Sequence, residues 1–184
     1  MRRGGLNNMN NNLEVDRTCI EEFNVSMEQL RELVQLTNRT LEHLNCELII
    51  VRNVSEFVKT DFYQSVNDES RQKLDDFMIS FNSFYICTHN LIVMLLDDIE
   101  GQTLREKAIQ FAHTLFHELR HAWQFKNNIF DMSKLLQTKN EGYLKQPHEI
   151  DAVIYSEWAT NHYKKEVANI FNIDSEWTIK SSFF

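Results

Sequence analysis

The sequence predicts an α+β domain that is mostly helical and carries a small sheet of about three strands. Two segments open with the S/T-x-x-E/Q capping box that begins a helix, Ser26 with Gln29 and Thr103 with Glu106. Short runs rich in β-branched and aromatic residues lie between these segments and predict the strands. At 184 residues, 42% of them hydrophobic, the chain can bury one sizeable core. We therefore expect a single domain over residues 21–184.

Residues 1–20 are expected to be a disordered, low-complexity N-terminus. They include Gly4, Gly5 and a series of asparagines, which offer too little apolar surface to offset the entropy of ordering. A twin-arginine export signal needs a hydrophobic run after its arginines, whereas asparagines follow Arg2 and Arg3. We therefore expect a cytoplasmic protein.

Membrane insertion and a disulfide framework are not expected either. The longest apolar run, residues 91–96, is too short to cross a bilayer and is typical of a buried strand. The cysteines are widely spaced, odd in number and without CxxC spacing: Cys19, Cys46 and Cys87. This pattern fits reduced, unreactive thiols in a cytosol.

The first half of the domain is expected to run helix, strand, helix. Apolar residues recur at helical spacing from Met27 to Leu44 and predict the first helix. Residues 46–51 are short and β-rich, and predict a strand. Ser55 is expected to cap a charged helical region that extends to about Met78 with a break near Asp68.

A hairpin is expected next. Residues 83–87 and 91–95 are two runs of β-forming residues on either side of Thr88-His89-Asn90. If residues 91–95 form a sheet edge, that strand could hold an extended peptide by β-addition. The alternative is that the strand simply belongs to the core.

The helix that follows carries the most informative motif of the chain, His117-Glu118-Leu119-Arg120-His121. One helical turn separates the two histidines, so both imidazoles lie on one face and can reach a single metal ion. Glu118 projects nearby, where a carboxylate can take a proton from a metal-bound water. An apolar stripe buries a neighbouring face of the helix: Leu104, Ala108, Phe111, Leu115, Leu119 and Ala122.

A zinc ion that performs chemistry needs a third protein ligand and an open fourth position. Glu149 is the best candidate, in the first turn of a helix expected from Pro147 to about Val167. The apolar side of this helix is expected to consist of Ile150, Val153, Ile154 and Trp158. The alternative for Glu149 is a carboxylate that merely stabilises the helix dipole.

The pair of motifs, His117-Glu118-x-x-His121 followed by Glu149-x-x-Ala152, resembles the gluzincin metallopeptidases, most closely the small ImmA/IrrE-type zincin domain. The resemblance covers about residues 46–163. It implies a zincin-like fold, Zn²⁺ as cofactor and Glu149 as third ligand. Several gluzincins place an aspartate four residues after that glutamate to orient a zinc histidine, but here Val153 stands there. Either Asp151 takes that task or no residue does.

Four further residues near the motifs are candidates for supporting roles. His113 lies one turn before His117, so it could support the metal ligands or compete with them, or be an ordinary hydrogen-bonded histidine. Zincins often use a tyrosine or histidine to stabilise the oxyanion that forms when water attacks a carbonyl. Tyr143, His148 and Tyr155 flank Glu149 and are candidates for that role, although each could instead serve packing.

These residues predict a zinc metallopeptidase in which Glu118 is the general base and the substrate is a peptide or protein. ImmA/IrrE-type proteins often act on DNA-binding repressors, so the resemblance implies a regulatory protein as a possible target. The net charge of −8, from 19 Lys and Arg against 27 Asp and Glu, argues against nucleic-acid binding.

Two alternatives remain open. One is a metal-dependent hydrolase of a non-peptide substrate, because the same water activation serves other amides and esters. The other is a catalytically inactive or regulatory zinc-binding interaction protein. Glu118 speaks against this second alternative, since a structural site needs no general base.

Overall fold

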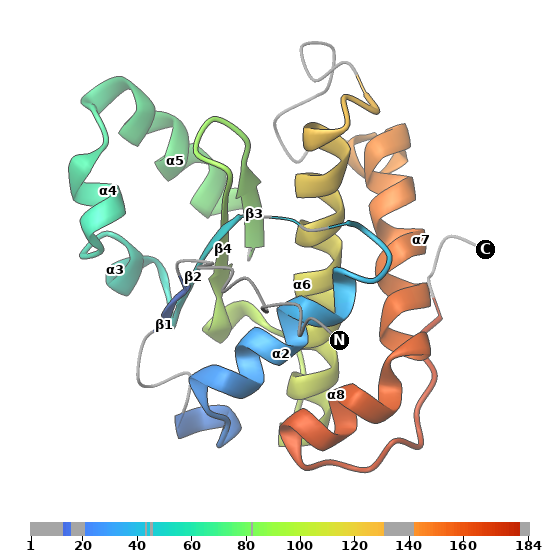
Figure 1. The fold of residues 1–184 in the computed structure, drawn as a ribbon. Coiled ribbons are helices and arrows are strands. Elements are labelled where there is room, and N and C mark those ends of the chain that lie inside the picture. Colours follow the sequence, from blue (N-terminus) through green and yellow to red (C-terminus); the bar gives the residue numbers. More distant parts are fainter. Residues whose placement is uncertain are drawn as a thin grey trace, which may run out of the picture.

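The computed structural model describes residues 13–15, 21–42, 44, 46–81, 83–130 and 142–180. In this part of the chain a mixed sheet lies between two groups of helices (Figure 1). The strands are β1 (Leu13–Val15), β2 (Glu47–Val51), β3 (Ser83–Ile86) and β4 (Leu91–Leu95), in the order β1-β2-β4-β3. β1, β2 and β4 are parallel, whereas β3 pairs with β4 as an antiparallel hairpin.

The helices divide between the two faces of the sheet. One face is covered by α2 (Met27–Thr37), α6 (Leu104–Lys126), α7 (Pro147–His162) and α8 (Lys164–Phe171). The other is covered by α3 (Val54–Phe57), α4 (Asp61–Ser65) and α5 (Asp68–Ser80). Short 3₁₀ turns follow β4 (Leu96–Asp98) and precede α7 (Tyr143–Lys145).

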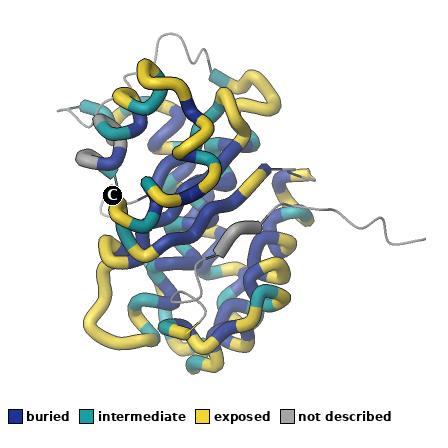
Figure 2. The backbone as a smooth tube through the Cα atoms, turned by 90° about the vertical axis from the view of Figure 1, so that its left-hand side faces the viewer, coloured by how far each residue is buried: buried dark blue, intermediate teal, exposed yellow. Residues whose placement is uncertain are grey.

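Burial on both faces explains why the central strands are apolar without alternation. In β4, Ile92 and Met94 join the core beneath α2 and α6, whereas Leu91, Val93 and Leu95 face the side of α3, α4 and α5. β2 divides in the same way, with Leu48 and Ile50 on the first side. Figure 2 shows the central strands as the buried middle of the molecule.

The predicted α+β class is confirmed, as are the hairpin and both capping boxes. Within the described residues the sheet has four strands, against about three expected. The additional strand β1 lies inside the stretch expected to be disordered, and the other residues of 1–20 fall outside the described part of the chain. Within the described residues, no helix is both long and apolar enough to cross a membrane.

Several helix boundaries differ from the prediction. α2 ends at Thr37, well before Leu44. The charged region after β2 is capped by Asn53, whose side chain accepts a hydrogen bond from the Glu56 N–H, and not by Ser55. Thr60 is extended and caps a second helix, and a third helix begins at Asp68, where the break was expected. The last predicted helix likewise breaks at Tyr163 and continues as α8.

The proposed peptide-binding strand was placed wrongly. β4 pairs with β2 on one side and with β3 on the other, so its backbone donors and acceptors are used within the sheet. The strand at the edge of the described sheet, next to the histidine motif, is β3.

The apolar face predicted for α7 is also wrong. Ile150, Ile154 and Trp158 are 37%, 46% and 43% exposed. The side of α7 that faces the core carries mostly small or polar residues: Ala152, Tyr155, Ser156, Ala159 and Thr160. Small side chains let α7 approach α6 closely, and this close approach decides which face is buried.

We predict that Ala159→Leu lowers the free energy of unfolding by about 1–3 kcal/mol, because the larger side chain must enter a closely packed interface. The matched change Ile154→Ser on the exposed face should alter it by no more than about 0.5 kcal/mol. Urea denaturation of both variants measures the difference. Equal effects would contradict this orientation of α7.

Candidate metal centre

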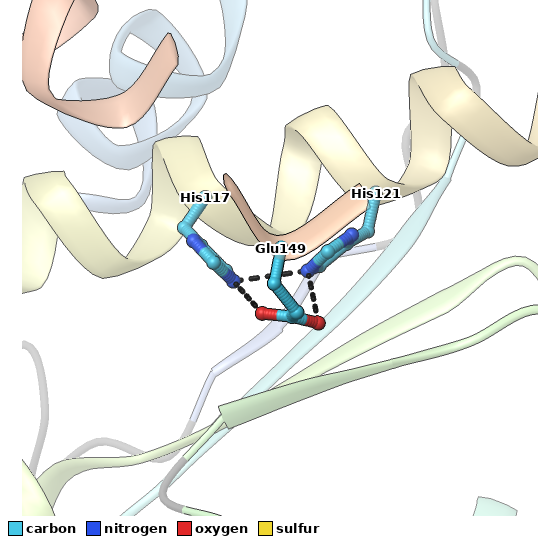
Figure 3. Close-up of side chains that lie close together, drawn as sticks. All are labelled: His117, His121 and Glu149. Carbon is cyan, nitrogen blue, oxygen red and sulfur yellow. Dashed lines mark hydrogen bonds and ion pairs between the residues drawn. The ribbon is translucent and has the colours of Figure 1, made fainter. Parts of the chain in front are cut away.

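Three side chains converge where the N-terminus of α7 meets α6 (Figure 3). Nε2 of His117 and Nε2 of His121 are 2.9 Å apart. Glu149 Oε2 lies 3.3 Å from His117 Nε2, and Glu149 Oε1 lies 3.3 Å from His121 Nε2. Ligands of a tetrahedral zinc, each about 2.0–2.1 Å from the ion, are about 3.3–3.4 Å apart. The observed separations therefore resemble the edges of a zinc site.

Local sequence features determine where the helices that carry these three side chains begin. The Thr103 capping box starts α6, and the two histidines follow on one face of the same helix. Pro147 occupies the first turn of α7, where its missing N–H costs nothing, and Glu149 comes two residues later. The packing of α7 along α6 then brings the carboxylate to the histidines.

The cluster contains a buried carboxylate whose negative charge a bound cation could compensate. Glu149 is only 2% exposed, and burial alone would raise the pKa of its carboxyl. The contacts with His117, His121 and His148 outweigh that effect and lower the pKa, so the carboxylate stays ionised. Among the described residues, no donor makes a well-directed hydrogen bond to Glu149 Oε1, although His121 and His148 lie close to it. A buried carboxylate oxygen of this kind fits a metal ligand.

Asp151 does not join the three convergent groups. Its carboxylate accepts two hydrogen bonds from Arg120, from Nε at 2.8 Å and from an NH₂ group at 3.1 Å. It accepts a third from the side-chain amide of Gln124 at 2.7 Å. Gln124 in turn contacts Nδ1 of His121 at 2.9 Å. Asp151 therefore reaches the histidine through Gln124, a residue that the sequence reasoning did not single out.

Glu118 lies beside this cluster and is buried. The hydroxyl of Ser83, the first residue of the edge strand β3, donates a hydrogen bond of 2.7 Å to Glu118 Oε1. Burial lowers the pKa of His121, but the carboxylates of Glu149 and Glu118 raise it and prevail, which places the Glu118 charge near the ring. Sequence reasoning also missed Ser83, because only the folded hairpin brings it to α6.

Of the three residues considered for oxyanion stabilisation, two lie at the cluster. His148 Nε2 is 3.1 Å from Glu149 Oε1. Burial raises the pKa of Tyr143, and the nearby carboxylates of Glu149 and Glu118 raise it further, so its phenol stays protonated. Tyr155 points elsewhere, since its hydroxyl shares a 2.8 Å hydrogen bond with Thr40. Tyr143 and His148 therefore remain candidates for stabilising the oxyanion, whereas Tyr155 does not.

His113 also lies apart from the three convergent groups. Its Nε2 is 3.0 Å from the Ser156 hydroxyl of α7. Burial lowers its pKa to about 4, with a smaller contribution from His117, so the ring is neutral at physiological pH. Its hydrogen bond links α6 to α7, which is a structural task.

Comparison with protein-family models, curated proteins and solved structures finds no match to this chain. The gluzincin resemblance therefore depends on the two short motifs and on the convergence of His117, His121 and Glu149.

We predict that the purified protein binds about one zinc ion per chain and that binding raises its melting temperature. His121→Ala should abolish tight binding because two protein ligands remain, and Glu149→Gln should weaken it. His89→Ala, at an exposed histidine of the hairpin turn, is the control and should bind normally. Zinc content by atomic absorption and thermal melts with added zinc provide the measurements. A wild-type protein that neither carries zinc nor gains stability from it would contradict the prediction.

Proposed function

We propose that this chain is a zinc-dependent metallopeptidase of the gluzincin type. The observation that carries the proposal is the cluster of His117, His121 and the buried Glu149, with the buried Glu118 carboxylate beside it. Structural zinc sites are usually closed by four protein ligands, whereas catalytic sites use three. Three converging groups and a separate buried carboxylate support the catalytic alternative.

In the proposed reaction His117, His121 and Glu149 would hold the ion. When bound, zinc would polarise the substrate carbonyl and make water more acidic. Glu118 accepts the proton of the attacking water and passes it to the leaving amine. The Ser83 hydrogen bond fixes Glu118 through Oε1, which leaves the other oxygen to accept the proton. Attack of water on the peptide carbonyl creates an oxyanion. Tyr143, whose phenol keeps its proton, and His148, which lies beside Glu149, can each donate a hydrogen bond to it.

The position of β3 supports a peptide substrate. β3 is at the edge of the described sheet and begins at Ser83, whose side chain touches the proposed base. An extended peptide that pairs with this edge would bring its backbone next to Glu118. We propose a peptide or protein substrate, with a regulatory protein as the target that the family resemblance implies.

We also propose a cytoplasmic location, as the cysteine pattern predicted. Cys46 and Cys87 are free thiols. Burial raises the pKa of Cys46 to about 11, which keeps this thiol protonated and unreactive at neutral pH.

We predict that Glu118→Gln keeps zinc binding and the fold but lowers peptide hydrolysis by about 10²–10⁴-fold, since it removes the general base. Glu166→Gln, a carboxylate change on α8, is the control and should retain full activity. Zinc-loaded proteins are incubated with a peptide library derived from a proteome, and cleavage is followed by mass spectrometry.

The same assay separates the alternatives. Undiminished cleavage by Glu118→Gln would exclude this base. Zinc binding without cleavage of any peptide would favour the regulatory alternative, and turnover of small esters or amides alone would favour a non-peptide hydrolase.

A further inference from the structure

Gln124 occupies an unusual place for a neutral amide, because it is 2% exposed and each polar atom of its side chain has a partner. Its Nε2 donates to the backbone carbonyl of His148 at 2.9 Å and to Asp151 Oδ2 at 2.7 Å. A carbonyl oxygen and an ionised carboxylate oxygen can only accept hydrogen bonds. The NH₂ group of Gln124 must therefore point toward α7.

This orientation determines which group the amide presents to His121. Gln124 Oε1 then faces His121 Nδ1 at 2.9 Å, and an amide oxygen can only accept. His121 must therefore carry a hydrogen on Nδ1. A neutral imidazole has a single N–H, so its Nε2 presents a lone pair. That Nε2 is the atom that meets His117 and Glu149.

Asp151, which accepts a hydrogen bond from Gln124, is itself held by further contacts. Arg120 binds both oxygens of Asp151, and its guanidinium lies 4.1 Å from the ring centre of Trp123. Because both oxygens of Asp151 accept hydrogen bonds from Arg120, Asp151 is an acceptor for Gln124 as well. The amide of Gln124 thus cannot turn over without placing its oxygen against two acceptors.

We propose that Gln124 is a positioning residue that fixes the tautomer and the ring orientation of His121 for metal binding. It takes the place of the carboxylate that commonly accepts the second N–H of a ligating histidine. A neutral amide does so without adding a further negative charge beside Glu149 and Glu118. This inference rests on the proposed metal site.

The test compares Gln124→Met, which keeps the length of the side chain but removes both hydrogen-bonding groups, with the control Gln110→Met on the same helix. Zinc affinity is measured by competition with a chelator, and folding by circular dichroism. Loss of an interaction of this kind typically weakens metal binding by about 10–100-fold. We expect that loss for Gln124→Met and no change for Gln110→Met. A folded Gln124→Met protein with wild-type affinity would overturn the proposal.

A second measurement does not depend on metal binding or on the folding of any variant. Long-range ¹H–¹⁵N NMR correlations of the His121 ring, recorded on the metal-free wild-type protein in alkaline solution, report which nitrogen carries the hydrogen. We expect Nδ1–H. Hydrogen on Nε2 would overturn the proposal even if zinc binds. Nδ1–H in a protein that binds no zinc would instead leave Gln124 as the tautomer-setting residue and contradict the zinc site alone.

Discussion

Burial of the Glu149 carboxylate is the constraint on which the arrangement of this molecule depends. An ionised group that is 2% exposed must be compensated by hydrogen bonds or opposite charge, or it destabilises the fold. Compensation here comes from His117 and His121 on α6 and from His148 on α7. It requires α6 and α7 to approach closely, which the small residues Ala152 and Ala159 permit.

Three carboxylates lie close together where α6 meets α7, and each has a different kind of partner. Asp151 is paired with Arg120 and serves as an anchor. Glu149 is surrounded by imidazoles and can act as a ligand. Glu118 accepts a hydrogen bond from the neutral hydroxyl of Ser83. In the function that we propose, anchoring, metal binding and proton transfer are therefore divided among three neighbouring carboxylates.

The sequence was most informative where a function requires local spacing. The i, i+4 histidines and the Thr103 capping box are properties of one helix, so they could be predicted without knowledge of the fold. The β-rich runs around Thr88-His89-Asn90 likewise needed only turn chemistry. The family motif pointed to Glu149 in place of Asp151, and the structure places Glu149, not Asp151, with the two histidines.

Features that depend on distant partners could not be predicted in this way. β4 lies in the centre of the sheet because it pairs in parallel with β2. The composition of a strand does not reveal such a pairing. α7 buries its small residues and exposes Trp158, because close packing on α6 outweighs the hydrophobicity of individual side chains.

The role of Gln124 also depends on distant partners and could not be predicted from the sequence. In the sequence Gln124 is one of two glutamines on a long helix, three residues after His121. Its significance comes from two acceptors on α7, the His148 carbonyl and Asp151, which fix the orientation of its amide. Through that orientation, as we propose, the contact between two helices determines which nitrogen of His121 presents a lone pair to the candidate metal site. The packing that buries Glu149 therefore also orients His121, its neighbour in the proposed metal site.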